Sequence, residues 1–119
     1  MILHLLTEAA AAGAQPDSDY LPPTFAADGF IHCTAGDELM LEVANRFYRE
    51  VADPMVAWSI DEERVRSEVR WEPPMPENPP NYHGPLFPHI YGPLNVDAVV
   101  DTRRLVRDTP GSFAGYEPM

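Results

Sequence analysis

Gly29-Phe-Ile-His-Cys-Thr34 leads directly into Ala35-Gly-Asp-Glu-Leu-Met-Leu-Glu-Val-Ala-Asn-Arg-Phe-Tyr-Arg-Glu50. The first part is short and apolar and follows a glycine, which is typical of a buried strand. Thr34, with Asp37 three residues later, resembles a helix start. Apolar residues then recur at helical spacing and form one face, made of Leu39, Met40, Val43, Ala44 and Phe47. The stretch therefore predicts a strand followed by the main helix of the protein, over 35–50.

The flanking segments predict mostly strands. Further strands are expected at 2–6, 55–60, 67–72, 86–91 and 96–107, and Thr7 is expected to cap a short helix over 8–12. Pro88 makes its strand an edge or bulged strand. With 119 residues there is room for one domain, so the whole chain is predicted to form a single small α+β domain of about five or six strands. The tail 108–119 is assigned no element and is a candidate for disorder.

Charge and composition exclude several function classes. The net charge is -11, and all eight basic residues are arginines, so lysine-based chemistry is excluded. The negative field disfavours bulk nucleic acid and anionic membranes as partners. The start lacks a basic region, no segment reaches the roughly 20 apolar residues of a membrane span, and Cys33 has no partner for a disulfide. We expect a cytoplasmic protein.

Three histidines stand out because each lies in a predicted strand among apolar neighbours. These are His4, His32 and His89. A single buried histidine is usually structural, but a core seldom recruits imidazole three times, because an unpaired ring nitrogen costs about 1–3 kcal/mol. We therefore predict that the three rings converge on one cleft. His83 is interpreted as a loop residue.

The surroundings of such a cleft leave two chemistries open. Neutral histidines recognise hydroxyls, amides or phosphates, with candidate companions Arg46, Tyr48, Arg70 and Tyr91. Three histidines also suit zinc, but they show no close pair in the sequence, so we predict no metal. Strand alternation places Cys33 on the face opposite His32, which favours core packing for the thiol.

Four strings in order carry a family resemblance over nearly the whole chain. They are Asp28-Gly-Phe-Ile-His-Cys-Thr34, Asn45-Arg-Phe-Tyr48, Val69-Arg-Trp-Glu-Pro73 and Leu86-Phe-Pro-His-Ile-Tyr-Gly-Pro-Leu94. In these strings the chain resembles the DUF952 family of small bacterial proteins, a family of unknown function.

At a more distant level the chain is similar to the ADP-ribosyltransferase fold, a split β-sheet that binds NAD between two small sheets. This resemblance implies that His4 contacts a ribose hydroxyl, that His32 lies beside the nicotinamide, and that His89 falls near the third family position. That position usually carries a glutamate, which a neutral histidine cannot replace.

Three functions follow as expectations. The first is binding of NAD, as candidate substrate, or of an ADP-ribose-like nucleotide by a divergent ADP-ribosyl- or phosphotransferase-type enzyme, with His4, His32 and His89 as catalytic residues. The second is a non-catalytic module for a small nucleotide or anionic metabolite. The third is a metal-dependent hydrolase. Fold resemblance alone does not decide among them.

Prolines are concentrated near the predicted site. Eight of the fourteen lie between Pro73 and Pro93. Because prolines restrict the chain before folding, a long loop that contains them loses less entropy on ordering. We predict that 73–85 forms an ordered loop that delivers His89 and Tyr91 to the rim of the cleft.

Overall fold

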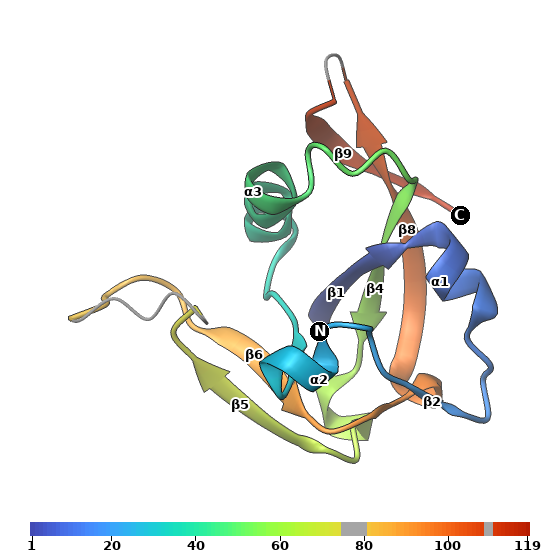
Figure 1. The fold of residues 1–119 in the computed structure, drawn as a ribbon, viewed down its shortest axis with the longest axis vertical. Helices are drawn as coiled ribbons and strands as arrows, with labels where there is room; N and C mark the ends of the chain where they lie inside the picture. Colours follow the sequence, from blue (N-terminus) through green and yellow to red (C-terminus); the bar gives the residue numbers. More distant parts are fainter. Residues whose placement is uncertain (75–80, 109–110) are drawn as a thin grey trace.

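Nine short strands and three α-helices make up the described part of the chain in a computed structural model, which covers residues 1–74, 81–108 and 111–119 (Figure 1). The helices are α1 (Glu8–Gly13), α2 (Phe25–Asp28) and α3 (Asp37–Phe47), and two 3-10 turns span Glu62–Arg64 and Val96–Ala98. The strands are β1 (Ile2–Thr7), β2 (Asp19–Tyr20), β3 (Ile31–His32), β4 (Met55–Ile60), β5 (Glu68–Glu72), β6 (Phe87–Tyr91), β7 (Leu94–Asn95), β8 (Val99–Arg107) and β9 (Phe113–Pro118). The predicted mixture of helix and sheet is confirmed, with strands predominating.

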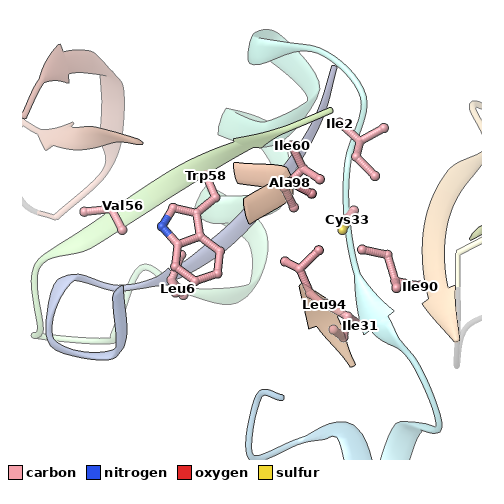
Figure 2. Close-up of a cluster of buried hydrophobic side chains, with 10 residues drawn as sticks. All are labelled: Ile2, Leu6, Ile31, Cys33, Val56, Trp58, Ile60, Ile90, Leu94 and Ala98. Carbon is pink, nitrogen blue, oxygen red and sulfur yellow. The ribbon is translucent and has the colours of Figure 1, made fainter. Parts of the chain in front are cut away.

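The larger sheet has the antiparallel order β1-β4-β8-β9 and is covered on both faces. The face towards the second sheet carries the cluster drawn in Figure 2, made of Ile2, Leu6, Ile31, Cys33, Val56, Trp58, Ile60, Ile90, Leu94 and Ala98. The other face packs Met55 and Ala57 against Met40 and Ala44 of α3. All six residues of β4 are therefore buried, although larger and smaller residues alternate along it, a pattern typical of a half-buried strand. A central strand with cover on both sides loses the usual polar face.

The second sheet has the antiparallel order β3-β6-β5, and a two-residue ribbon joins β2 to β7. Ile31 pairs with Ile90, which pairs with Val69 on its other side, and this apolar row faces the core. The two main sheets are joined by a bridge at which the backbones of Leu3 and Thr34 exchange hydrogen bonds of 2.7 and 2.8 Å. The sheet is thus split into two parts that share one core.

The bridge explains why α3 begins later than predicted. Thr34 does not cap the helix, because its backbone is paired with Leu3; α3 instead begins at Asp37 after Gly36, whose φ is +100°. A positive φ of this size is readily adopted only by glycine. At the first helix the prediction is confirmed, since the side chain of Thr7 accepts a hydrogen bond from the Ala10 amide at 3.1 Å.

Pro88 was predicted to mark an edge or bulged strand, and this was wrong. It lies in β6, the central strand of the second sheet. The Pro88 carbonyl accepts a hydrogen bond from the Cys33 amide at 3.1 Å, but proline has no backbone N–H with which to donate a second one. Because β3 ends at His32, this missing donor lies where the pairing of the two strands already stops.

The C-terminal segment contains a strand that was not predicted. β8 begins at Val99 after the turn at Val96–Ala98, and β9 then pairs along it. The tail 108–119, a candidate for disorder, is thus a paired strand over Phe113–Pro118. Phe113 is buried beside α3, and Asn45 of the helix bonds to both its backbone groups, at 2.7 and 3.0 Å.

Candidate functional site

The polar face of the second sheet carries a row of His32, His89 and Arg70 across β3, β6 and β5. The register pairs His32 with His89 and His89 with Arg70, one residue along from the apolar row. Successive side chains of a strand point to opposite faces, so burying the isoleucines turns these three residues outward. The rings of His32 and His89 lie 5.7 Å apart. Two of the three predicted histidines are therefore brought together.

A cleft of about 630 Å³ is lined by this histidine face and by α3. Its volume lies within the roughly 300–1,000 Å³ of typical small-molecule sites. The wall from α3 combines three apolar residues, Leu39, Val43 and Phe47, with the charged side chains of Glu42 and Arg46. The predicted apolar face of the helix is thus divided, since Met40 and Ala44 pack in the core while the other three residues line the cleft. Figure 1 shows α3 and β6 on the same side of the molecule.

His89 is almost fully buried beneath the cleft. Its ring stacks on Phe30 with centroids 4.1 Å apart, and its Nδ1 lies 2.8 Å from Oε1 of Glu72. The same carboxylate oxygen accepts the Tyr91 hydroxyl at 2.5 Å. That hydrogen bond from Tyr91 holds the pKa of Glu72 below its usual range. Burial lowers the pKa of His89 against the opposing effect of Glu72, so the ring is neutral and the carboxylate charged at neutral pH.

His32 has a carboxylate partner of its own. Its Nε2 lies 2.9 Å from Oδ2 of Asp28, at the end of α2. The His32 side chain is 42% exposed, in contrast to that of His89. The cleft is therefore lined by two imidazoles, each hydrogen-bonded to a different carboxylate.

His4 is not among the residues that line the cleft. Its Nδ1 donates to the His32 carbonyl at 2.7 Å, and its Nε2 lies 3.0 Å from the hydroxyl of Tyr20. Burial lowers the pKa of His4 to about 4, so the ring is neutral. The prediction that all three histidines converge on the cleft is wrong in this respect: His4 supports the strand that carries His32.

The four predicted companions divide into two pairs. Arg46 and Tyr48 line the cleft, and burial raises the pKa of Tyr48. Arg70 and Tyr91 lie on the same face of the sheet but outside the lining, with the Arg70 guanidinium 4.3 Å from the centre of the Tyr91 ring. Two hydrogen bonds, of 2.8 and 3.1 Å, hold Arg70 to Glu68, although Glu72 lies at the same separation along β5 in the other direction.

Sequence reasoning missed the two carboxylates that hold the histidine rings. Strand alternation already placed Glu72 on the Arg70 face, and pairing of β5 with β6 makes this the His89 face as well. Asp28 lies four residues before His32, a spacing that brings side chains together within a helix, but α2 ends at Asp28 and His32 lies in β3.

Cys33 packs in the core at the edge of the cleft. Cys33 borders the cleft but is 2% exposed and belongs to the core cluster of Figure 2, as predicted. Burial raises the pKa of its thiol.

Among residues 1–74, 81–108 and 111–119, no group of three or more His, Cys, Asp or Glu side chains is placed to hold a metal ion.

Both ends of the proline-rich loop reach the cleft. Pro74, Tyr82 and Pro85 contribute to its lining, and the Tyr82 hydroxyl donates to the Pro85 carbonyl at 2.6 Å. Residues 75–80 lie outside the described residues, so order along the whole of 73–85 stays a prediction. His83 lies in an exposed loop, as expected.

Comparison with solved structures finds clear relatives. The crystal structure of protein CC0527 from Caulobacter crescentus matches with a TM-score of 0.75 and 29% identity, covering 95% of this chain and 92% of that one. The solution NMR structure of CC0527 matches with a TM-score of 0.70 and 30% identity, over 92% and 88% of the two chains. No curated protein matches.

The three α-helices are short. Within the described part of the chain, no helix has the length and apolar character needed to cross a bilayer.

A family model, described as a protein of unknown function (DUF952), matches residues 5–102 and so includes both histidines of the cleft and both their carboxylate partners. The chain therefore belongs to the DUF952 family.

Proposed function

We propose that the cleft binds a small nucleotide-like ligand, such as NAD or ADP-ribose. The observation that carries the proposal is the convergence of His32 and His89, each hydrogen-bonded to a carboxylate, on a cleft of about 630 Å³ with a partly apolar wall. Small-molecule sites combine a mostly apolar lining with a few convergent polar groups in this way.

The lining offers a partner for each part of such a ligand. Leu39, Val43 and Phe47 suit a flat ring, and the two histidines suit hydroxyl or amide groups. Arg46 brings positive charge to the lining, whereas Asp28 and Glu42 bring negative charge. This balance favours a ligand with few, localised phosphates over a polyanion such as a nucleic-acid backbone.

The proposal has two forms, which differ in whether the bound ligand reacts. Under the resemblance to ADP-ribosyltransferases, the cleft belongs to a divergent ADP-ribosyl- or phosphotransferase, and the charged Glu72 beside His89 supplies a carboxylate near the third family position. The placement of His4 outside the cleft favours the alternative, a non-catalytic binding module, since only two of the three expected positions line the cleft.

Saturation-transfer NMR with NAD, ADP-ribose and nicotinamide tests the binding proposal. We expect transfer from the wild-type protein to at least one of the three, and its loss or strong reduction in His32→Ala. His83→Ala is the matched control, because this histidine is exposed in a loop, and it should bind as the wild type does. Absence of transfer to all three probes contradicts the proposal.

Incubation with NAD then separates the two forms. Chromatographic detection of free nicotinamide, abolished in His89→Gln, identifies an enzyme, whereas binding without release identifies a binding module. Metal analysis of untagged protein addresses the metal-dependent hydrolase, for which the described residues provide no cluster of ligands.

A further inference from the structure

The hydrogen bonds around Glu72 distinguish the two nitrogens of the His89 ring. Oε1 of Glu72 lies 2.8 Å from Nδ1 of His89 and accepts the Tyr91 hydroxyl at 2.5 Å. A carboxylate only accepts hydrogen bonds, so Nδ1 carries the proton that joins it to Glu72. In a neutral imidazole the second nitrogen is then an acceptor.

That second nitrogen is the part of the ring left for the cleft. Among the described residues, no hydrogen bond to Nε2 of His89 is found, and the ring belongs to the cleft lining. Stacking on Phe30 fixes the plane of the ring. The orientation of the acceptor is therefore set by the protein before any ligand arrives.

Further contacts along β5 and β6 hold the carboxylate in place. The Tyr91 ring lies under the Arg70 guanidinium, and Arg70 is held in turn by two hydrogen bonds to Glu68. Glu68, Arg70 and Glu72 alternate along β5 and so share the face of His89. All of these contacts therefore lie within β5 or between β5 and its partner strand β6.

We propose that Glu72 is a positioning residue that holds His89 as a neutral ring with its proton on Nδ1, so that Nε2 offers the cleft a hydrogen-bond acceptor. Such a site selects a ligand group that donates, namely an amide N–H or a sugar hydroxyl, and it does not attract phosphate oxygens to His89. The selection of ligands rests on the proposed function, whereas the state of the ring does not.

Ring nitrogen chemical shifts from long-range 1H–15N NMR test the state of the ring in the ligand-free protein. We expect a protonated Nδ1 and a non-protonated Nε2 for His89 in the wild type. In Glu72→Leu, the Nε2 resonance should move towards the protonated position, because the acceptor that fixed the proton is lost. Glu68→Leu is the matched control on the same face of β5 and should keep the proton on Nδ1 of His89, because Glu72 is still present to accept it.

Two results overturn the role of Glu72. One is a proton on Nε2 in the wild-type protein, a measurement that needs no variant and so is independent of any folding defect. The other is an unchanged Nδ1-protonated ring in folded Glu72→Leu, with fold checked by the backbone amide spectrum.

The selection of donors is tested with nicotinamide and methyl nicotinate, which share a ring but differ in the amide N–H. We expect the wild type to bind nicotinamide roughly two- to tenfold more tightly, the range of one net hydrogen bond, and Glu72→Leu to lose the difference. Equal binding of both probes by the wild type overturns the selection. Binding of neither probe is a failure of the proposed function for this ring, and the selection fails with it, while the ring nitrogen shifts still decide the role of Glu72.

Discussion

Nδ1 of His4 donates to the backbone carbonyl of His32 across 2.7 Å, from one sheet of the molecule to the other. Close by, Leu3, one residue before His4, and Thr34, two residues after His32, form the backbone bridge that joins the sheets. His4 therefore acts on the site through the backbone of the strand that carries His32. The position that the family resemblance assigned to a ligand contact is occupied by a buried histidine whose two ring nitrogens are both hydrogen-bonded within the protein.

Folding stability should fall as the pH is lowered because of His4. Burial lowers its pKa from the ordinary 6.5 to about 4. Between these values the unfolded chain binds a proton that the folded protein does not, so the free energy of unfolding decreases as the pH falls through this interval. The full effect of this group is roughly 3 kcal/mol. Urea unfolding at pH values from 7.5 to about 4 measures it.

His4→Gln removes the titrating ring from this position and should flatten the pH dependence. Some slope should remain, because burial also lowers the pKa of His89, which titrates in the same direction. His83→Gln, at an exposed loop position, is the control and should keep the wild-type slope. A His4→Gln protein whose stability varies with pH as steeply as the wild type would show that His4 is not held neutral.

Arg46 should contribute to phosphate recognition, and Arg70 should not. Arg46 lines the cleft, whereas Arg70 lies outside the lining and is hydrogen-bonded to Glu68. Replacing Arg46 by Ala should weaken ADP-ribose binding about tenfold, the size expected for a charge-assisted hydrogen bond, and leave nicotinamide binding nearly unchanged. Isothermal titration of both ligands against Arg46→Ala and Arg70→Ala measures this.

An equal loss of ADP-ribose affinity in both arginine variants would point to the general charge of the protein as the cause. In that case the loss should disappear at high salt in both variants, because long-range interactions between surface charges are screened there. A specific contribution from Arg46 should persist in part.

The sequence predicted the elements of the site better than the contacts between them. Alternation along β5 puts Arg70 and Glu72 on one face, and strand alternation also placed His32 on the face opposite Cys33, which was expected to pack in the core. The pairing partners of β6 were not predicted, because Pro88 argued for an edge. Without that register, nothing in the sequence related Glu72 to His89.

Features that depend on tertiary packing were the ones missed. His4 has the same kind of neighbours as His89, and only the position of the second sheet decides that the His4 ring meets a carbonyl and a tyrosine hydroxyl. Thr34 has the sequence of a helix cap, but its backbone is used by Leu3. In both cases a long-range backbone contact overrode a local signal.

The C-terminal strand should depend on one side chain of α3. Asn45 accepts from the Phe113 amide at 2.7 Å and donates to the Phe113 carbonyl at 3.0 Å, so it replaces a strand partner at the start of β9. Asn45→Ala leaves these backbone groups unpaired beside the core and should lower the free energy of unfolding by about 1–3 kcal/mol. Urea unfolding measures the loss, with Glu38→Ala on the exposed side of the same helix as control. A change below about 0.5 kcal/mol would mean that β9 is held by its pairing with β8 alone.

Cys33 should report opening of the structure at the site. The thiol is 2% exposed and burial raises its pKa, so the reactive thiolate is scarce in the folded protein. Its neighbour Thr34 forms the bridge between the sheets, so exposing Cys33 requires this junction to separate. Alkylation by iodoacetamide at pH 8, followed by mass spectrometry, should be slow in the native protein and fast in urea.

The same reaction detects a ligand of the cleft without any assumption about its contacts. A ligand that binds only the folded form lowers the population of the open form by the factor 1 + [L]/Kd, so alkylation should slow by that factor when opening is at equilibrium. NAD, ADP-ribose and nicotinamide can be compared in this way at matched concentrations. Fast alkylation in the native protein without ligand would contradict the burial of Cys33, and with it the closed junction between the two sheets.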